Sequence, residues 1–370
     1  MALLRSVVLA GGGTGGHIYP LLAFADAVKR HFPEVRITAL GSPQGMENEL
    51  IPPTGYDLRI IPAFQLPRSI NMNLLRTPDR MYKSAHAAGK IIDEVRADVV
   101  VGFGGYVSVP AYLAAWRRDL PIVIHEVNVP PGVANRMGMR FTKNVAVGFP
   151  SQPQQAESLR DARVVGVPLR TKLTHLDRAA LRPQALHQFG LRPDLPVLFV
   201  SGGSSGARTI NLAVAAAAKR LAHAGIQVLH VQGGRNDPFE VPGDLPVPYV
   251  VLPYLSDMQL GYAAADLMLC RGGAITVAET TALGVPAIYV PYPHSNQEQK
   301  RNALPVVEAG GGIMVDNSEL TPAWIEQHII PLARDRGRLE MMGAAASRYG
   351  RRDGDEALLE FVLEAVAKAR

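Results

Sequence analysis

The sequence is poor in cysteine, in charge and in aromatic residues. Among its 370 residues, cysteine occurs once, at Cys270, so no disulfide can form within the chain. This usage is typical of a protein from a reducing compartment such as the cytoplasm. Charged residues make up 19% and aromatic residues 6% of the chain, while hydrophobic residues reach 47%. This balance is typical of a soluble globular protein and excludes intrinsic disorder.

Neither a convincing secretory signal nor an unbroken hydrophobic span is expected. The first ten residues contain one arginine and no small-residue cleavage site, and they run directly into glycines. An uncharged stretch of 18 residues, Val99–Trp116, approaches the length of a membrane-spanning helix, but three glycines and Pro110 interrupt it. We interpret this stretch as a buried strand, a glycine turn and the start of a helix.

Positive charge is unevenly distributed along the chain. Residues 1–150 hold 16 Lys and Arg against 11 Asp and Glu, whereas residues 151–370 hold 22 of each sign. The whole net charge of +5 therefore lies in the first half. We expect that half to face an anionic partner (nucleic acid, an acidic membrane or a charged substrate), unless the excess is a random property of the surface.

The chain is too long for one ordinary core, and its two halves are built alike. Residues 5–30 and 195–220 each contain a short apolar run, then glycines with Ser or Thr, then a helical pattern that ends in Lys-Arg. In both halves, Val- and Ile-rich runs then alternate with helical patterns, which indicates parallel sheets covered on both faces. The predicted fold class is α/β, with two Rossmann-like domains whose parallel sheets face a deep cleft.

We expect the first domain to span residues 1–166 and the second to span residues 167–349. The boundary follows the Pro- and Gln-containing residues 150–158. The amphipathic pattern at about 350–370 is expected to form a helix that packs back on the first domain. Ligands of such folds bind in the cleft, at the carboxyl ends of the strands.

The glycine run near the N-terminus, Gly11–Gly16, fits the pattern G-x-G-x-x-G. A dinucleotide site also needs an acidic residue at the end of the second strand, where it binds the ribose. That strand is expected at Arg36–Leu40, and neither of the next two residues is acidic. A nicotinamide site is therefore disfavoured, and the absence of G-x-x-x-x-G-K-[ST] excludes a P-loop.

Two further glycine turns follow predicted strands, at Gly102–Ser108 and Ser201–Arg208. Backbone N–H groups that converge at the N-terminus of a helix favour anions. Three such turns around one cleft predict a diphosphate-type ligand. The alternative is that each turn has only a structural role.

Two residues of the second domain are candidates for binding a nucleotide sugar. Glu279 lies near the start of a predicted helix, where its carboxylate can accept two hydrogen bonds from a ribose diol. Its alternative role is that of a partner of the helix dipole. Gln299, in the following loop, offers an amide that can reach a sugar.

His17 is expected in the first turn of a helix, directly after the glycine run. The helix dipole disfavours the protonated imidazole there, and a neutral imidazole suits a general base. The alternative is a residue that only packs or caps. His125, Glu126 and Asn128 follow another strand and are expected at the same rim. The sequence contains no HExxH motif, no Cys/His cluster and no carboxylate pair after a strand, so we expect no metal and no cofactor.

Six motifs occur in the order and spacing of one enzyme family: Gly12–His17, Gly102–Ser108, His125–Asn128, Val164–Arg170, Gly202–Arg208 and Cys270–Pro291. Over nearly its whole length, the chain resembles the bacterial family 28 glycosyltransferases of peptidoglycan synthesis. The resemblance implies the two-domain GT-B fold. It also implies metal-independent, inverting transfer of GlcNAc from UDP-GlcNAc to lipid I (undecaprenyl-pyrophosphoryl-MurNAc-pentapeptide), which yields lipid II and UDP.

The resemblance also implies roles for individual residues. His17 would be the base, and the other catalytic residues would be Glu126 and Tyr106. The UDP-GlcNAc contacts would be Thr14, Gly15, Gly16, Asn128, Arg170, Ser204, Leu255, Ala274, Ile275, Thr276, Val277, Ala278, Glu279 and Gln299. The acceptor contacts would be Gly104, Gly105, Tyr106 and His125. Within this set, Glu279 would hold the ribose and the backbone of Leu255 would lie by the uracil.

Several positions depart from the family pattern. Val127 replaces the Gln of HEQN, Val167 and Leu169 alter GNPVR, Ser205 replaces the Gln of GGSQGA, and Glu298 replaces the first residue of a Gln-Gln pair. These changes affect the expected rim of the cleft. They leave open some of the amide contacts to the sugar, but not the fold.

A lipid-linked acceptor offers an explanation for the uneven charge. The first half interleaves basic residues (Arg59, Arg68, Arg76, Arg80, Lys83, Lys90 and Arg96) with Leu74, Leu75, Met81 and Tyr82, and adds Trp116, Arg117, Arg118, Arg140 and Lys143. Such a surface suits an anionic phospholipid membrane, and the alternative is an ordinary solvated face. We expect a peripheral protein at the cytoplasmic face of the bacterial inner membrane, with no nucleic acid partner.

Two other functions stay open at this point. A UDP-GlcNAc 2-epimerase-like isomerase would share the two-domain fold but would need neither a lipid acceptor nor a basic, apolar surface. An inactive nucleotide-sugar-binding scaffold would bind UDP-GlcNAc without turnover.

Overall fold

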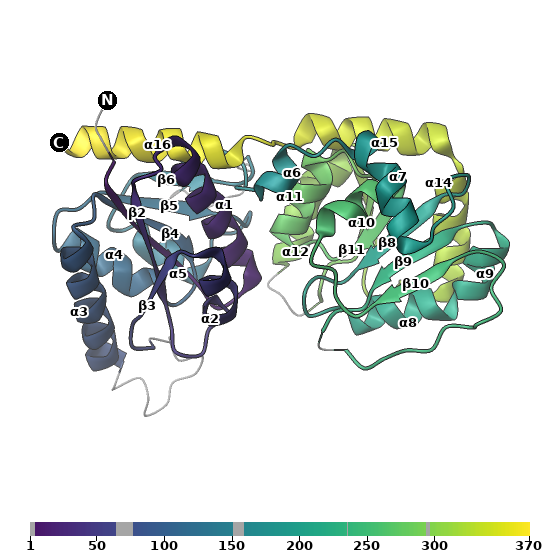
Figure 1. Ribbon diagram of the computed structural model, residues 1–370, viewed down its shortest axis with the longest axis horizontal. Coiled ribbons are helices and arrows are strands. Elements are labelled where there is room, and N and C mark those ends of the chain that lie inside the picture. The colour runs from purple at the N-terminus through teal and green to yellow at the C-terminus, as the bar shows by residue number, and fades with distance from the viewer. Residues whose placement is uncertain (1–3, 64–76, 151–158, 235, 294–296) are drawn as a thin grey trace. The chain divides into compact units, whose positions relative to one another are not determined.

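The computed structural model describes residues 4–63, 77–150, 159–234, 236–293 and 297–370. The chain divides into two compact units, of which the first consists of residues 1–171 and 352–370 and the second of residues 172–351. Each unit contains one β-sheet with helices packed against it (Figure 1). Residues 151–158, which belong to the stretch expected to precede the domain boundary, lie outside the described residues.

The first unit is built around a seven-stranded sheet in the order β3-β2-β1-β4-β5-β6-β7, in which all neighbouring strands are parallel. The strands are β1 (Ser6–Gly11), β2 (Arg36–Gly41), β3 (Asp57–Ile60), β4 (Val99–Gly104), β5 (Ile122–Glu126), β6 (Val145–Val147) and β7 (Arg163–Val164). The helices are α1 (Gly15–His31), α2 (Glu47–Leu50), α3 (Thr77–Val95), α4 (Ser108–Trp116), α5 (Val133–Gly138) and α16 (Gly354–Ala369), with a 3-10 turn at Pro52–Thr54. The strand order reverses between β1 and β4, which is the topological switch point of a Rossmann-like sheet.

The central strands β1 and β4 are buried on both faces of the sheet, as their continuous apolar runs predicted. Every residue of β1 and β4 is buried. Because successive side chains point to opposite faces, Val7 and Leu9 pack with α1 and α16, whereas Val8 and Ala10 pack with α3 and α4. The uncharged stretch Val99–Trp116 forms β4, a glycine turn and α4, as predicted.

The C-terminal helix α16 belongs to the first unit, where it lies beside α1 (Figure 1). Its apolar face, including Leu358 and Val362, is buried in the core that α1 also lines. Arg30 of α1 donates hydrogen bonds to Asp355 (2.5 Å) and Glu356 (2.6 Å) at the start of α16. Apolar packing and charge-assisted bonds thus fix the helix to the first unit.

The second unit contains a six-stranded parallel sheet in the order β10-β9-β8-β11-β12-β13. The strands are β8 (Val197–Ser201), β9 (Gln227–Val231), β10 (Tyr249–Leu252), β11 (Leu267–Cys270), β12 (Ala287–Tyr289) and β13 (Gly312–Met314). The helices are α6 (Thr171–Thr174), at the passage between the units, α7 (Arg178–Phe189), α8 (Arg208–Ala216), α9 (Ala218–His223), α10 (Met258–Ala264), α11 (Ala274–Ala282), α12 (Glu298–Glu308), α13 (Pro322–Trp324), α14 (Ile330–Arg334) and α15 (Arg336–Tyr349). A π-helical turn spans Ile325–Ile329. The topological switch point of the six-stranded sheet lies between β8 and β11.

Two parallel-sheet units of this kind confirm the predicted α/β fold class with two Rossmann-like domains. Within the described ranges, no helix combines the length and the apolar composition needed to cross a bilayer.

Candidate functional site

The two glycine turns of the first unit meet at its switch point, where β1 and β4 end. The amide of Gly12 donates to the carbonyl of Gly104, with 3.3 Å between nitrogen and oxygen. Gly105 has a φ of 86°, and a β-carbon there would lie only 2.3 Å from the Gly12 oxygen. Only glycine fits this close approach. The two turns therefore form one continuous edge of backbone groups.

His17 lies beside this edge, in the first turn of α1. Its Nδ1 is 3.0 Å from the carbonyl oxygen of Gly12 and 3.5 Å from Oγ1 of Thr14. Because a carbonyl oxygen can only accept, we assign the ring proton to Nδ1. Nε2 of the neutral ring then carries the lone pair that a base needs. This nitrogen lies next to Gly104, where a β-carbon would be 3.1 Å away from it.

Glu47, a residue that was not predicted for the site, packs against the first glycine turn. It opens α2 and is fully buried. Its Oε2 accepts a hydrogen bond from the Gly13 amide (3.0 Å), and its Oε1 accepts from the amide and the hydroxyl of Ser42 (2.8 Å each). Glu47 comes six residues after the end of β2, beyond the position where a ribose-binding acid was sought. Because it is buried and held by protein donors, it does not restore a dinucleotide site.

His125 is buried beneath the edge rather than exposed on it. Its side chain has no solvent exposure, and Nε2 donates to the carbonyl of Gly166 (2.9 Å). Burial lowers the pKa of His125 to about 4, so the ring is neutral at neutral pH. The ring therefore lies below the accessible surface, and the acceptor contact of His125 stays a prediction.

Glu126 is also buried, with 2% exposure. It accepts hydrogen bonds from the amides of Asn128 and Gly132 (2.9 Å each) and from the side chain of Asn135 (3.0 Å). Burial raises the pKa of Glu126, and these hydrogen bonds oppose that effect. Glu126 therefore fixes the loop that follows β5, and its direct catalytic contact stays a prediction. Strand β5 continues through Glu126. His125 and Glu126, which were expected at the rim of the cleft, therefore form the buried end of this strand.

Other predicted residues of the first unit remain accessible. Tyr106 is 40% exposed, and Asn128 is partly exposed at the end of β5. The guanidinium of Arg170 lies 5.3 Å from the ring centroid of Tyr19 on α1. Thr14–Gly16, at the start of the same helix, are exposed or partly exposed. The structure thus places Arg170 near the helix start that carries His17.

In the second unit, the turn after β8 is fixed by the turn after β9. The amide of Gly234 donates to the carbonyl of Ser204 (3.1 Å), and the side chain of Asn236 donates to the carbonyl of Ser205 (2.7 Å). The side chain of Ser204 is exposed. The backbone of this turn is therefore held in place while the Ser204 hydroxyl stays accessible.

Glu279 lies in α11, which follows β11 at the switch point. Its side chain is largely buried, and Oε2 accepts a hydrogen bond from the hydroxyl of Tyr262 on α10 (2.5 Å). A hydroxyl that donates to one carboxylate oxygen restricts the rotation of the whole group. Tyr262 therefore orients the carboxylate predicted to bind a ribose.

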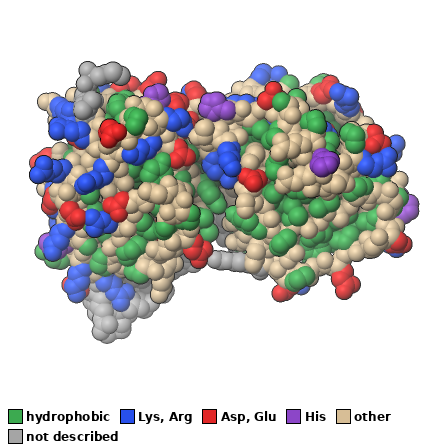
Figure 2. Space-filling model, in the orientation of Figure 1, with side chains coloured by type: hydrophobic (Ala, Val, Ile, Leu, Met, Phe, Trp, Pro, Cys, Tyr) green, Lys and Arg blue, Asp and Glu red, His purple; other side chains and the backbone are tan. Residues whose placement is uncertain are grey.

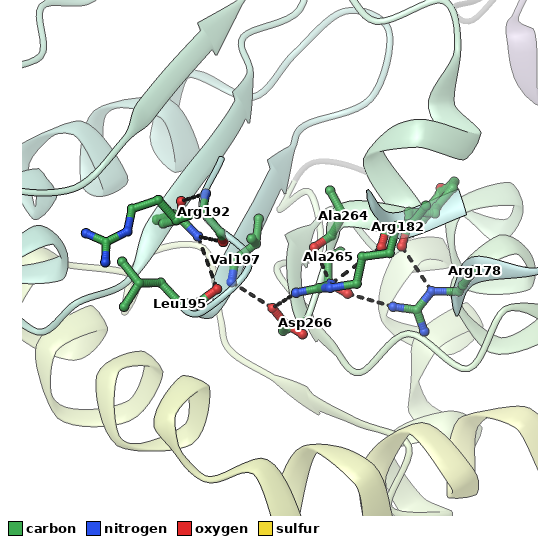
Figure 3. Close-up of polar contacts among 11 residues, drawn as sticks. Arg178, Arg182, Arg192, Leu195, Val197, Ala264, Ala265 and Asp266 are labelled. Atoms are coloured by element: carbon green, nitrogen blue, oxygen red, sulfur yellow. Dashed lines mark hydrogen bonds and ion pairs between the residues drawn. The ribbon is translucent and has the colours of Figure 1, made fainter. Parts of the chain in front are cut away.

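Two arginines of α7 fix the end of α10 that carries Tyr262 (Figure 3). Arg178 donates to the carbonyls of Tyr262 (3.0 Å) and Ala265 (2.6 Å), and Arg182 donates to the carbonyl of Ala264 (2.7 Å). The last carbonyls of a helix lack partners within the helix and carry partial negative charge, which cations stabilise. Through these bonds, the two arginines help to fix the position of Tyr262, which orients Glu279.

In the first turn of α11, backbone groups rather than side chains are the main groups available to a ligand. Ala274, Val277 and Ala278 are buried, whereas Ile275 and Thr276 are partly exposed. Gly273, at the N-cap, contributes no side-chain cap. A ligand would therefore meet mainly the N–H groups of this turn.

Leu255 and Gln299 are more restricted than expected. The Leu255 side chain is mostly buried, which is consistent with the predicted contact through its backbone. Oε1 of Gln299 accepts a hydrogen bond from the amide of Tyr292 (2.9 Å). Nε2 is therefore the group of Gln299 that would contact a sugar.

Arg271, which was not predicted, directly follows β11. It donates to the carbonyl of Val290 (3.0 Å) and to the side chain of Asn317 (2.7 Å), and it lies over the ring of Tyr292. Burial lowers the pKa of Arg271. A charged residue directly after a fully apolar strand was the sequence signal for this contact. Across the described parts of the chain, no group of three or more His, Cys, Asp or Glu could hold a metal ion.

Comparisons with known proteins place this geometry in a family. Residues 7–147 match the glycosyltransferase family 28 N-terminal domain, and residues 197–358 match the family's C-terminal domain. A Streptomyces avermitilis protein named UDP-N-acetylglucosamine–N-acetylmuramyl-(pentapeptide) pyrophosphoryl-undecaprenol N-acetylglucosamine transferase is 52% identical over 364 residues, which are 98% of each chain. A Nocardioides protein of the same name is also 52% identical, over 97% of each chain.

A solved structure agrees with these matches. The crystal structure of Acinetobacter baumannii MurG is similar to this chain with a TM-score of 0.76 and 28% identity, and the match covers 97% of this chain and 99% of that one. This protein therefore belongs to glycosyltransferase family 28.

Proposed function

We propose that this protein transfers GlcNAc from UDP-GlcNAc to the MurNAc 4-hydroxyl of lipid I, which yields lipid II and UDP for peptidoglycan synthesis. The observation that carries the proposal is the 52% identity, over 98% of both chains, to a relative named as the N-acetylglucosamine transferase for N-acetylmuramyl-(pentapeptide) pyrophosphoryl-undecaprenol. The match extends over both units, and each unit has glycine turns at its switch point that suit a phosphate group.

In this proposal, the second unit binds the donor. The turn at Ser204 and the N–H groups of the first turn of α11 bind the diphosphate. Glu279 accepts hydrogen bonds from the ribose hydroxyls, the backbone of Leu255 lies by the uracil, and Nε2 of Gln299 contacts the sugar. The support is that Glu279 is oriented by Tyr262 and that the Ser204 turn is fixed by its neighbour.

The first unit binds the acceptor and takes its proton. The acceptor oxygen attacks the anomeric carbon from the face opposite UDP, and the bond from that carbon to the diphosphate breaks, with its electron pair leaving on UDP. Nε2 of His17 accepts the proton of the attacking hydroxyl. Arg170 and the Thr14–Gly16 turn stabilise the charge on the leaving diphosphate. Tyr106 contacts the acceptor. Asn128, in the loop that Glu126 fixes, contacts UDP-GlcNAc.

An assay with labelled UDP-GlcNAc tests the proposed function. Release of UDP should depend on a lipid I analogue, and the label should appear in a β-1,4-linked disaccharide. An epimerase-like isomerase would instead convert the donor sugar without the analogue, and a scaffold would bind the donor without turnover. Either of these results would contradict the proposal.

We further propose that the first unit binds anionic phospholipid at the cytoplasmic face of the inner membrane. Figure 2 shows Lys and Arg side chains along the edge of this unit that carries α3. Tyr82 (58% exposed) and Trp116 (52% exposed) accompany exposed basic residues such as Lys90 and Arg117. Of the residues predicted for this surface, Arg68, Leu74, Leu75 and Arg76 lie outside the described residues.

Internal ion pairs reduce the charge of this surface. Arg59 pairs with Glu94, and Arg118 with Asp93. We therefore expect moderate rather than strong membrane attraction, carried by the remaining basic residues and the exposed aromatic rings.

Binding to vesicles should reveal this attraction. The double variant Lys90→Glu, Arg117→Glu should bind phosphatidylglycerol-rich vesicles about tenfold or more weakly than the wild type, because each basic residue near an anionic surface contributes about 1 kcal/mol. Raising the salt concentration should also weaken wild-type binding. Arg336→Glu, a charge reversal at an exposed site of the second unit, serves as the control and should leave binding unchanged. Equal wild-type binding to neutral and anionic vesicles in a flotation assay would disprove the membrane proposal.

A further inference from the structure

A single peptide group connects His17 to the buried carboxylate of Glu47. This group consists of the C=O of Gly12 and the N–H of Gly13. The carbonyl accepts from Nδ1 of His17 (3.0 Å), and the N–H donates to Oε2 of Glu47 (3.0 Å). In a trans peptide these two bonds point in opposite directions. The imidazole and the carboxylate therefore lie on opposite sides of one polarisable group.

The surroundings of Glu47 fit a carboxylate that stays in place. Its side chain is fully buried, and a buried charge requires hydrogen-bond partners, which the Gly13 amide and Ser42 supply. A β-carbon at Gly12 would lie 2.9–3.0 Å from the carboxylate atoms of Glu47, so any larger residue there would displace the group. The glycine run thus makes room for the carboxylate as well as forming a turn.

We propose that Glu47 is a positioning residue that holds His17 in its Nδ1-protonated form, through the Gly12–Gly13 peptide, and increases the basicity of Nε2. This inference rests on the proposed role of His17 as the base. A carboxylate beside the N–H draws negative charge onto the carbonyl oxygen, because hydrogen bonds in a chain polarise one another. The carbonyl then binds Nδ1–H more strongly, most of all when the ring is protonated. Glu47 itself touches no substrate.

Other charged and titratable groups lie on the elements next to His17. Glu126 of β5 holds Asn135, whose side-chain nitrogen lies near the Gly104 position that packs against the imidazole. Arg170 lies over Tyr19 of α1, and Tyr106 follows the Gly104–Gly105 turn. None of these groups is changed in the variants below, so a shift in the titration of His17 between variants reports on Glu47.

Two variants separate positioning from packing. Glu47→Gln keeps the shape of the side chain, but an amide has one oxygen and cannot accept from both Ser42 and Gly13. If Oε1 keeps the Ser42 bonds, the NH₂ group faces the Gly13 N–H, and the connection to His17 is broken. Ser42→Ala removes one bond to the same carboxylate and leaves the Gly13 bond intact. Both variants are expected to lower the melting temperature, but only Glu47→Gln should change His17.

The titration of His17 is followed by NMR on full-length protein labelled with ¹⁵N-histidine, and the His17 signal is assigned by its loss in His17→Ala. We expect the wild-type ring to be Nδ1-protonated at neutral pH. In Glu47→Gln, the titration midpoint should fall by about half to one pH unit, as expected for the loss of a nearby partly screened charge. In Ser42→Ala, the midpoint should stay unchanged.

Three results would overturn the inference: an Nε2-protonated ring in the wild type, an unchanged midpoint in Glu47→Gln, or an equal shift in Ser42→Ala. The first needs no variant, so it tests the inference even if Glu47→Gln fails to fold. The acidic limb of the pH–kcat profile tests the base role separately. If the NMR midpoint moves and this limb does not, the positioning role is supported and the proposed base is wrong.

Discussion

Replacing His17 by alanine is expected to lower kcat by about 10²–10⁴-fold, the usual contribution of a general base. The affinity for UDP-GlcNAc should change by less than about threefold, because no predicted donor contact is made by this side chain. The reason for the loss is geometric: Nδ1 is engaged by the Gly12 carbonyl, so Nε2 is the nitrogen that accepts a proton. Steady-state UDP release gives kcat, and calorimetric titration with UDP-GlcNAc gives the affinity.

His223→Ala is the matched control for this experiment. His223 ends α9 in the second unit, is exposed, and has Nδ1 engaged by a backbone carbonyl (that of Lys219, 2.6 Å), as in His17. It should keep wild-type kcat. If His17→Ala lost less than about tenfold in kcat, His17 would not be the base. If it lost donor affinity in proportion to kcat, the histidine would be a binding residue.

Replacing Glu279 by alanine is expected to weaken UDP binding by about 10–100-fold, which corresponds to about 1.4–2.8 kcal/mol for hydrogen bonds to a charged acceptor. At saturating donor, kcat should fall much less. Tyr262→Phe keeps the carboxylate but removes the hydroxyl that orients it. This variant should weaken binding by only about threefold, because one neutral donor to the group is lost.

A donor analogue shows whether the effect arises at the ribose. UDP and 2′-deoxy-UDP should differ in affinity for the wild type and bind equally to Glu279→Ala, which is a double-mutant cycle between a side chain and a ligand hydroxyl. If Glu279→Ala weakened both ligands by the same factor, the carboxylate would act on the helix instead, as the alternative interpretation of the sequence holds.

The sheets were predictable because their signal is local and repeated. Val7–Ala10 and Val197–Val200 are apolar at every position. A strand needs this pattern only when both of its faces are covered, and glycines follow each run. The position of His17 after the first turn was equally clear. These features depend on neighbours within one strand–turn–helix unit.

What the sequence did not reveal depends on contacts between distant segments. Glu47 lies 34 residues from Gly13, and nothing in its local pattern distinguishes it from a surface residue at the start of a short helix. His125 and Glu126 were expected on the rim because they are polar and follow an apolar run. Their burial depends on Gly166 and Asn135, which approach from elsewhere in the chain.

The return of α16 to the first unit affects how the protein is made. Residues 1–171 are synthesised before the second unit, but the core of the first unit also needs Leu358, Leu359 and Val362, which are synthesised after it. All residues of the second unit are synthesised in between, so that unit can fold while the first still exposes the surface that α16 will cover. The first unit is thus completed only after the whole second unit has been synthesised, and during that interval its apolar surface is open to aggregation or to chaperones.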